Sequence, residues 1–382
     1  MRFAILGTGF VADYYMKSMS NYDQHSLAGV FDIDGARLDQ FSNHYNCKTY
    51  ASQAALLADE TVDAVAVLTG PELHFELASA ALKAGKHVYC EKPMATNLDD
   101  ARKLVAQAHK AGLVLVSAPA NIYSDAFLLA QNSITSSDIG APKLVYAEME
   151  DGAVFRENWH AWRSESGAQW PGKHEFEIGC TLEHAGYSLS WLIGLFGSIK
   201  RITGTSAVLF LDKGADIANG KMGPDFSSAV LEFESGVIAR LTCGLCAPKD
   251  RSMTIMGADG TLTIADIWDN RSDIFLEAEV FNLTLLGRLA RRFEAMRGKV
   301  LPFKPRAGRK LRYTKDVSAT HLPKYPSQID FFAGPHALTE CVEGGRKQSK
   351  RLAAEALHIT EAALALNQLG PSGSSYEMTS SL

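Results

Sequence analysis

The amino-acid sequence predicts an α/β protein that begins with a doubly wound parallel sheet and continues into an antiparallel one. Strand-like and helix-like patterns alternate through residues 1–121, as they do in a parallel sheet with helical crossovers. A glycine-rich turn lies between the first strand and the first helix. After Asn121 the pattern changes to short alternating strands with turn residues between them, which is typical of a meander.

The strands of the first part are short apolar runs rich in β-favouring residues, and the helices between them repeat apolar residues at helical spacing. No stretch of this region has the composition of an interdomain linker. We expect strands at residues 3–6, 27–31, 64–68, 88–90 and 114–117, and helices at residues 12–20, 36–45, 74–84 and 98–111.

The second part begins with a helical pattern and is then dominated by strands. Glu234-Ser235-Gly236 and Ala258-Asp259-Gly260 supply turns between neighbouring strands. We expect the first unit to span residues 1–121, the second to span 122–370, and the serine-rich end, 371–382, to be disordered. The expected elements are a helix at 125–135 and strands at 143–150, 199–209, 227–234, 236–243, 252–256 and 261–264.

Composition excludes several classes of function. The chain has 382 residues, 46% of them hydrophobic and 21% charged, as in soluble globular proteins. A formal net charge of -5 argues against a general nucleic-acid binder. The sequence starts without a secretory signal, and the apolar stretch 185–197 is too short to span a bilayer. We therefore expect a cytoplasmic protein that is not inserted in a membrane.

Six cysteines in a chain of this length indicate reduced thiols rather than a disulfide framework. Cys243 and Cys246 form a lone CxxC inside an apolar, strand-like run. With no second pair and no nearby histidine, buried thiols are the favoured interpretation and a zinc site is the minor one. We expect no metal.

The turn after the first strand reads Gly7-Thr8-Gly9-Phe10-Val11-Ala12, a GxGxxA pattern. The first glycine permits a tight turn, the second lets the backbone approach a pyrophosphate, and the small Ala12 lets the helix pack closely on the sheet. Asp32 ends the second strand, where a carboxylate can accept hydrogen bonds from both ribose hydroxyls and repels a 2′-phosphate. The pattern favours NAD(H) over NADP(H), with Asp32 as a simple turn acid as the alternative.

Two later strands also end in polar residues. Glu91 and Lys92 follow an apolar strand directly, and Pro93 then ends it because proline has no N–H to donate. Ligands of parallel sheets bind beyond the carboxyl ends of the strands, so Lys92 is a candidate for substrate contact. A solvated loop lysine is the plain alternative. Thr69 follows the preceding strand, where it could reach the nicotinamide side, whereas His74 is more typical of a helix-start residue than of a catalyst.

These motifs resemble the Gfo/Idh/MocA oxidoreductases. The resemblance rests on GTGFVA, Asp32, the turn 69–74 and the run AGKHVYCEKPMA, and it extends to the closing segment that runs from residue 325 to Leu369. It implies an N-terminal Rossmann domain and a C-terminal domain whose open, mainly antiparallel sheet covers the nicotinamide. It also implies that Lys92 lies beside the substrate carbonyl or carbinol, that the bond from Lys92 to Pro93 is cis, and that the protein forms a homo-oligomer, a dimer or tetramer.

The family's second signature is an Asp followed four residues later by a His at the start of a helix. The matching run here places Glu183 at the Asp position and Tyr187 at the His position, with His184 three residues before Tyr187. Glu183 and Tyr187 therefore share a helical face, and His184 lies on nearly the same face. Tyrosine in place of histidine resembles the glucose–fructose oxidoreductase branch, in which the phenol exchanges the proton. Trp162-Arg163 resembles a family pair near the cofactor.

The residue types at positions 187 and 184 also predict how these side chains would exchange protons. We expect the Lys92 cation to lower the pKa of Tyr187 so that the phenol can exchange a proton. We expect His184 to titrate near neutrality and to serve as a substitute base. The alternative is that His184 and Tyr187 are helix residues anchored by hydrogen bonds in the core.

Two stretches depart from the family pattern. Residues 168–177 form a longer link than usual, and Trp170, Lys173, His174 and Glu175 either face the substrate or belong to a solvated insertion. Residues 269–324 form a basic insertion, with an amphipathic pattern at 285–297. A solvated or oligomer-contacting face, a clamp for an anionic substrate and a membrane-surface contact remain open for it.

We therefore expect an NAD(H)-dependent dehydrogenase or reductase that moves a hydride to or from a secondary alcohol or ketone of a sugar, sugar derivative, sugar nucleotide or cyclitol. One alternative is a lyase, epimerase or glycosidase that oxidises its substrate only transiently, and another is an NAD-binding regulator without activity. The expected catalytic residues are Lys92, Tyr187, His184 and Glu183. The residues expected to contact the cofactor are Gly7, Thr8, Gly9, Phe10, Val11, Asp32, Thr69, His74, Glu91, Lys92, Asn121, Trp162 and Arg163.

Overall fold

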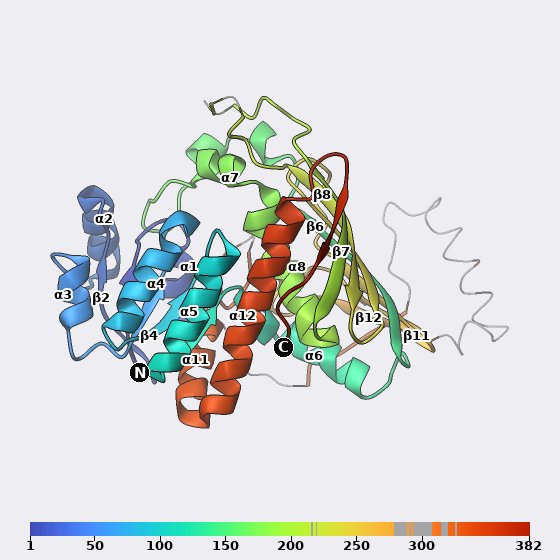
Figure 1. Ribbon diagram of the computed structural model, residues 1–382, viewed down its shortest axis with the longest axis horizontal. Helices are drawn as coiled ribbons and strands as arrows, with labels where there is room; N and C mark the ends of the chain where they lie inside the picture. The colour runs from blue at the N-terminus through green and yellow to red at the C-terminus, as the bar shows by residue number, and fades with distance from the viewer. Residues whose placement is uncertain are drawn as a thin grey trace.

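Two sheets and the helices packed on them make up the structure, a computed structural model that describes residues 1–214, 217–218, 220–278, 289, 292, 308–314, 320–324 and 327–382 (Figure 1). The amphipathic pattern at 285–297 lies outside these residues apart from Leu289 and Arg292, so it stays a prediction. Among the described residues, no helix combines the length and the apolarity that crossing a membrane requires.

The first sheet is fully parallel, in the order β2-β1-β3-β4-β5, as the alternating pattern predicted. Its strands are buried because they are apolar on both faces and helices flank them. The strands are β1 (Arg2–Leu6), β2 (Ser26–Phe31), β3 (Ala64–Val67), β4 (His87–Cys90) and β5 (Leu115–Ser117). The helices are α1 (Ala12–Met19), α2 (Gly35–Tyr45), α3 (Gln53–Ala58), α4 (His74–Lys83) and α5 (Leu98–Ala111), of which the sequence missed only the short α3.

The second sheet is mixed but mostly antiparallel, with nine strands among the described residues in the order β13-β12-β11-β10-β6-β9-β8-β7-β14. One pair, β6 with β9, is parallel. Strand β12 lies inside 269–324, so this stretch is partly a strand of the sheet and not wholly an insertion. The strands are β6 (Pro142–Glu150), β7 (Ile199–Ala207), β8 (Phe226–Phe233), β9 (Ile238–Gly244), β10 (Met253–Gly257), β11 (Gly260–Ile264), β12 (Ile274–Ala278), β13 (Arg309–Lys310) and β14 (Ser374–Glu377).

The end of the chain is ordered, and the expectation of a disordered tail was wrong. Strand β14 pairs antiparallel with β7 and so covers the edge of the second sheet. The carboxylate of Glu361 accepts hydrogen bonds from the Tyr376 hydroxyl and from the backbone N–H groups of Thr379 and Ser380. The small polar residues of this segment suggested disorder, but in the structure the edge strand β7 and the carboxylate of Glu361 supply their hydrogen-bond partners.

Helices join the two sheets. Most residues of the helix α8 (Cys180–Phe196) are buried, and the helix fills the space between the second sheet and α12 (Arg346–Asn367). The helix α12 also packs against α5 and β5 of the first sheet, and α11 (Ala333–Gly344) contacts β4 and β5. Figure 1 shows α12 running between α5 and α8. The remaining helices are α6 (Asp125–Thr135) and α7 (Gly172–Ile178).

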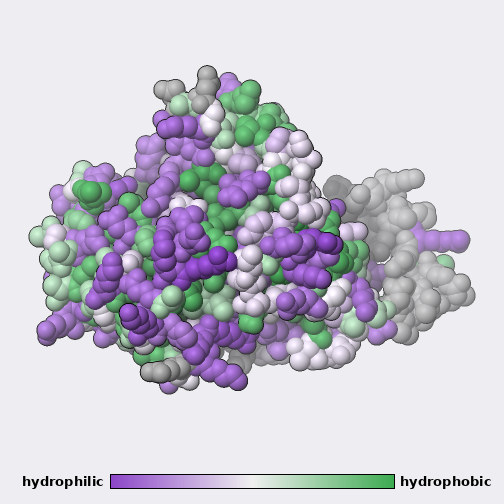
Figure 2. Space-filling model, in the orientation of Figure 1, coloured by the Kyte–Doolittle hydropathy of each residue, from purple (hydrophilic) through white to green (hydrophobic). Residues whose placement is uncertain are grey.

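The surface over α5 and α12 is largely polar in Figure 2, which fits their exposed faces. Apolar side chains gather at the top of that view, where the loop after β7 lies in Figure 1. Leu209 and Leu211 of this loop are exposed. Scattered exposed leucines of this kind are ordinary on protein surfaces.

Glu150 places an ionisable group at the buried end of β6. The residue is 5% exposed, and its Oε1 has no hydrogen-bond partner among the described residues. Burial raises the pKa of Glu150 to about 7. Because the folded state binds this proton more tightly than the unfolded chain does, its stabilising contribution is full below the ordinary pKa of a glutamate and is lost as the pH rises through about 7.

We expect the substitution Glu150→Gln to remove this loss of stability. The amide has nearly the same shape and cannot ionise, so the variant should exceed the wild type by about 1–2 kcal/mol in unfolding free energy near pH 8, and should show no such gain near about pH 5. Urea unfolding at the two pH values measures the difference. An equal pH dependence in both proteins would contradict the assignment of this proton to Glu150.

Candidate active site

A cleft of about 1670 Å³ lies along the carboxyl ends of the first sheet's strands. Its walls come from the turns after β1, β2, β3 and β4, from the segment between β6 and α7, and from the first turns of α8. Pockets for drug-sized ligands measure about 300–1,000 Å³, so this cleft can hold a dinucleotide and a second small molecule together.

The glycine turn fits a pyrophosphate at one end of this cleft. Gly7 has φ +97°, and a Cβ there would lie 2.7 Å from the carbonyl oxygen of Leu68, so only glycine fits. A Cβ on Gly9 would meet nothing within 4 Å, because this glycine faces the open cleft. The N-terminus of α1 follows at Ala12 without a side-chain cap, and the positive end of the helix dipole favours an anionic phosphate there. The residues present therefore suit a bound dinucleotide phosphate.

Asp32 lies at the end of β2 beside an arginine that the sequence analysis did not single out. Arg37 Nη2 lies 2.8 Å from Oδ1 of Asp32, and Arg37 Nε lies 3.1 Å from Oδ2. The backbone N–H of Thr8 donates to the same carboxylate at 2.7 Å. Burial raises the pKa of Asp32, but the donors from Arg37, Thr8 and Asp34 outweigh it and hold this pKa below its ordinary value. The carboxylate is ionised and has a cation beside it.

Lys92 makes a short ion pair with Glu183. The Nζ of Lys92 lies 2.7 Å from Oε2 of Glu183, and the two side chains are 12% and 10% exposed. The peptide bond from Lys92 to Pro93 is cis, as the resemblance implied. Glu91, just before it, accepts hydrogen bonds from the Tyr15 hydroxyl at 2.5 Å and from the Lys92 backbone N–H at 3.0 Å. Hydrogen bonds to both carboxylate oxygens therefore hold the Glu91 side chain in place at the end of β4.

The charge state of this pair follows from its surroundings. Burial lowers the pKa of Lys92, but Glu183 and the other nearby acids raise it by more, so the ammonium stays protonated. Burial raises the pKa of Glu183, and the adjacent Lys92 lowers it below its ordinary value. At neutral pH the cleft therefore contains the Lys92 ammonium cation paired with the Glu183 carboxylate anion.

His184 and Tyr187 face the same cleft as Glu183, on the predicted face of α8. The ring of Tyr187 lies with its centroid 5.6 Å from Lys92 Nζ. The Nε2 of His184 lies 3.9 Å from Oδ2 of Asp151 and 4.0 Å from Oε2 of Glu175. Trp268 packs against both rings. All four expected catalytic side chains thus line one cavity.

The acid–base expectations for these two side chains were wrong. Burial raises the pKa of Tyr187 well above that of a free phenol, and the lowering by Lys92 is the smaller effect. Burial also lowers the pKa of His184 from its ordinary value, against the pull of Asp151. At neutral pH the phenol keeps its proton and the imidazole is neutral.

Three of the expected cofactor contacts do not line the cleft, because each is buried and has another partner. Both donors of Thr8 go to Asp32. The ring nitrogens of His74 lie 2.7 Å from the carbonyl oxygen of Pro93 and 2.9 Å from that of Thr69, so His74 ties the two turns together. Asn121 Nδ2 donates to the backbone of Tyr187 at 3.0 Å. The other ten do line the cleft: Gly7, Gly9, Phe10, Val11, Asp32, Thr69, Glu91, Lys92, Trp162 and Arg163.

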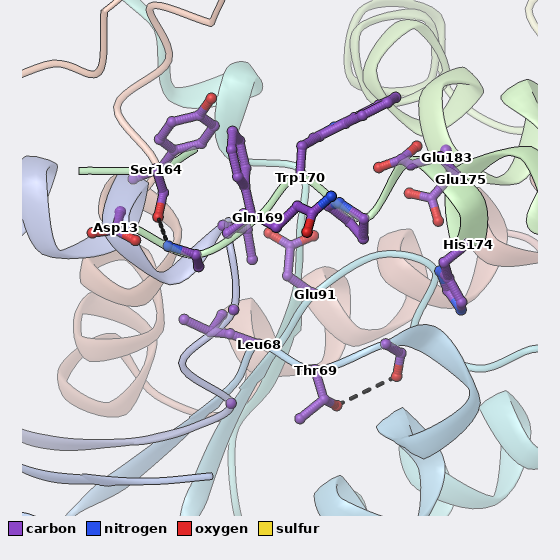
Figure 3. Close-up of a pocket in the computed structure, with 18 of the residues that line it drawn as sticks. Asp13, Leu68, Thr69, Glu91, Ser164, Gln169, Trp170, His174, Glu175 and Glu183 are labelled. Carbon is purple, nitrogen blue, oxygen red and sulfur yellow. Dashed lines mark hydrogen bonds between the residues drawn. The ribbon is translucent and has the colours of Figure 1, made fainter. Parts of the chain in front are cut away.

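The link at 168–177 contains most of the helix α7, and it lines the cleft with Trp170, His174 and Glu175, whereas Lys173 is exposed and does not line it. Trp170 packs against Trp162, and His174 Nε2 lies 2.7 Å from Oε1 of Glu72. Glu175 points toward Glu183 and His184 from the first turn of α7, as Figure 3 shows for the two carboxylates. The sequence analysis missed Asp151, although it follows strand β6 directly, the same signal that singled out Lys92.

A short segment of the second unit around Ser166, here called the strap, contacts the first turn of α1, which follows the glycine turn. Both donors of Ser166 reach the carboxylate of Asp13 in the first turn of α1, the backbone N–H at 2.9 Å and the hydroxyl at 2.8 Å. Tyr45 donates to Asp13 as well, at 2.6 Å. Figure 3 shows Asp13 and Ser164 at this end of the pocket, opposite Glu175 and Glu183. These hydrogen bonds tie the lining segment around Ser166 to the first turn of α1.

The chain matches two family models in tandem. Residues 1–118 match the oxidoreductase family with an NAD-binding Rossmann fold, and residues 127–263 match the GFO/IDH/MocA C-terminal domain. The chain belongs to the Gfo/Idh/MocA oxidoreductase family. The predicted family and fold class are confirmed, and so is the prediction of an oxidoreductase enzyme.

Relatives in the family carry dehydrogenase and reductase names. The NADP(+)-dependent scyllo-inositol 2-dehydrogenase of Bacillus subtilis is 25% identical over 295 residues, 74% of this chain and 87% of the relative. The 1,5-anhydro-D-fructose reductase of Ensifer adhaerens is 38% identical over 118 residues, 31% of this chain and 35% of the relative. The aldose–aldose oxidoreductase of Caulobacter crescentus shares the fold, with a TM-score of 0.72, 18% identity and 99% of each chain covered.

Proposed function

We propose that this Gfo/Idh/MocA protein transfers a hydride between NAD(H) and a secondary alcohol or ketone of a sugar, sugar derivative or cyclitol. The observation that carries the proposal is the Lys92–Glu183 ion pair, held at 2.7 Å where the strand β4 opens into the cleft. The names of the inositol and anhydrofructose relatives support a polyhydroxylated substrate. We further propose that residues 1–121 bind the dinucleotide and residues 122–370 supply the substrate wall.

The bound dinucleotide would supply or accept the hydride. Lys92 would lie against the substrate oxygen, where its cation stabilises the negative charge that develops as the carbonyl carbon gains a hydride. Glu183 would hold the ammonium in place and keep it protonated. Tyr187 would donate a hydrogen bond from its neutral phenol, and His184 would accept a proton from the substrate side. Positioning the two reactants in one cleft supplies much of the remaining rate.

Asp32 and Arg37 bear on the choice of dinucleotide. A carboxylate at Asp32 can accept hydrogen bonds from both ribose hydroxyls, which supports NAD(H). Arg37 is 39% exposed beside it and could turn to a 2′-phosphate, the group that distinguishes NADP(H). The Arg37 guanidinium pairs with the Asp32 carboxylate and does not displace it from the end of β2, where it can meet the ribose hydroxyls. We therefore propose NAD(H) as the preferred cofactor and NADP(H) as a more weakly bound one.

We expect NADH to bind more tightly than NADPH, and Arg37→Ala to weaken NADPH by about tenfold while leaving NADH within about twofold. The reason is that only NADPH carries a phosphate for the guanidinium to bind. Fluorescence titration of the purified protein gives both values of Kd. Lys48→Ala, an exposed lysine outside the cleft, is the matched control. Tighter binding of NADPH by the wild type would overturn the proposed preference.

The substrate proposal is tested by identifying any dinucleotide that co-purifies and then screening neutral sugars, cyclitols and sugar nucleotides for a change in NAD(H) absorbance. A broad panel with no turnover of either kind would contradict it. The Ser166–Asp13 strap supports a second candidate, transient oxidation with a retained cofactor, as in a lyase, epimerase or glycosidase. In that case product forms while no NADH accumulates, and the dinucleotide remains bound through gel filtration.

A further inference from the structure

Among the described residues, the imidazole of His184 is the only ionisable group that an ion pair within 4 Å links to Glu175, and Glu91, which also lacks an ion pair, differs in accepting hydrogen bonds from Tyr15 and from the Lys92 backbone. The Oε2 of Glu175 is buried, has no hydrogen-bond partner among the described residues, and lies 4.0 Å from Nε2 of His184. Glu183 forms an ion pair with Lys92, and Oδ1 of Asp151 lies 3.5 Å from Nη1 of Arg251. Glu175 therefore has no oppositely charged group in direct contact among the described residues, and its Oε2 has no hydrogen bond there.

The groups around Glu175 make its ionised form costly. Burial raises the pKa of Glu175, the adjacent Glu183 carboxylate raises it further, and Lys92 only partly lowers it, so the pKa lies well above the ordinary value. The titratable and charged groups that face this cluster from α7, α8, the ends of β4 and β6, the turn after β3 and the loop before β10 are His174, Glu183, His184, Tyr187, Glu91, Lys92, Asp151, Glu72 and Arg251.

The other candidates for the proton step are poorly suited to exchange with water. The ammonium of Lys92 and the phenol of Tyr187 both have raised pKa values and hold their protons at neutral pH. His184 has a lowered pKa, so it accepts a proton only briefly. The raised pKa of Glu175 and the lowered pKa of His184 both reduce the preference of the proton for the imidazole over the carboxylate, which favours exchange between the two groups.

We infer that Glu175 takes part in the proton transfer of this site. It holds a proton that it exchanges with the substrate oxygen through His184. This inference rests on the proposed function. In reduction Glu175 passes its proton to the neutral imidazole of His184, the resulting imidazolium gives a proton to the carbonyl oxygen as the carbonyl carbon gains the hydride, and water then reprotonates the Glu175 carboxylate. In oxidation the carbinol carbon loses the hydride, and the hydroxyl proton follows the reverse path to the Glu175 carboxylate.

Proton release on cofactor binding tests the inference without any substrate. The oxidised dinucleotide brings a positive ring into the cleft that the reduced form lacks, and a nearby positive charge favours an ionised carboxyl group. We expect the wild type to release up to about one more proton per site on binding the oxidised form than the reduced form near neutral pH. A pH indicator in weak buffer measures the difference, with whichever of NAD+ and NADP+ binds more tightly.

Glu175→Gln should abolish this difference, and Glu177→Gln, on the same helix but outside the cleft lining, should keep it. Infrared difference spectra of the wild type provide a second readout that needs no variant: a protonated-carboxyl band should disappear when the oxidised form binds. Once a substrate is known, Glu175→Gln should lower kcat by about 10²-fold, leave KM within about twofold, and flatten the pH profile.

Undiminished proton release in Glu175→Gln, or no change in the wild-type carboxyl band, would overturn the role of Glu175 while leaving hydride transfer intact. Intact proton release in a protein that turns over no substrate would instead count against the proposed function alone. The two failures are therefore distinguishable.

Discussion

Replacing Lys92 with methionine is expected to lower kcat by about 10³-fold or more while leaving the dinucleotide Kd within about twofold. Methionine keeps much of the length and apolar volume of the side chain but removes the cation that would stabilise the developing oxyanion. The loss should lie in the hydride step, because the positive charge matters most when the substrate oxygen carries the most negative charge. Single-turnover measurements of NAD(H) absorbance, with the substrate found in the screen, isolate that step.

Lys83→Met is the matched control for this experiment, since Lys83 is an exposed lysine near the end of α4, outside the cleft. It should keep wild-type turnover. A Lys92→Met enzyme with a hydride-transfer rate within tenfold of the wild type would remove Lys92 from the catalytic residues and leave the cleft without its proposed electrostatic centre.

Breaking the buried ion pair from the other side is expected to cost stability as well as activity. Glu183→Gln leaves the Lys92 ammonium 12% exposed and without its 2.7 Å partner, and we expect a loss of about 2–4 kcal/mol in unfolding free energy near pH 7. Lys92→Met leaves Glu183 instead, whose pKa then rises because burial is no longer offset. The double variant removes both charges and should be more stable than Glu183→Gln alone.

Urea unfolding of the wild type, the two single variants and the double variant gives the coupling between the residues. The pH dependence supplies a second signature: the pKa of Glu183 is depressed in the folded state, so its contribution is present above the ordinary pKa of a glutamate and is lost as the pH falls through the lower, folded value. Additive single effects would show that the two charges do not stabilise one another. Glu76→Gln, an exposed acid on α4, serves as the control.

Local signals in the sequence were enough to predict the first sheet and half of the cleft. The glycine turn, Asp32 and the polar residues after β4 are recognisable because each lies directly at a strand end, and the order of a parallel sheet brings strand ends to one edge. The ranges predicted for α5 and α6 match the structure at both ends. Asn97 caps α5 through its side chain, which fixes where that helix begins.

The features that were missed depend on contacts between distant segments. Strand β14 forms only because the edge of β7 is unpaired until the chain's end reaches it. The pKa of Tyr187 was misjudged because spacing indicated the nearby Lys92 but not the depth of burial, which is the larger effect. Glu175 was one of four residues singled out in an unusually long link, and its distinction from the other three arises only where α7 meets α8.

The placement of α12 has a consequence for how the molecule is made. This helix packs on α5 and β5 of the first sheet and on α8 and β7 of the second, yet it lies close to the end of the chain. The Rossmann unit emerges first during synthesis, but one of its apolar surfaces stays uncovered until α12, more than two hundred residues downstream, has been made. A chain that stops before α12 would expose that surface to aggregation and to proteases, so the packing of α12 makes the stability of the first unit depend on the presence of the second.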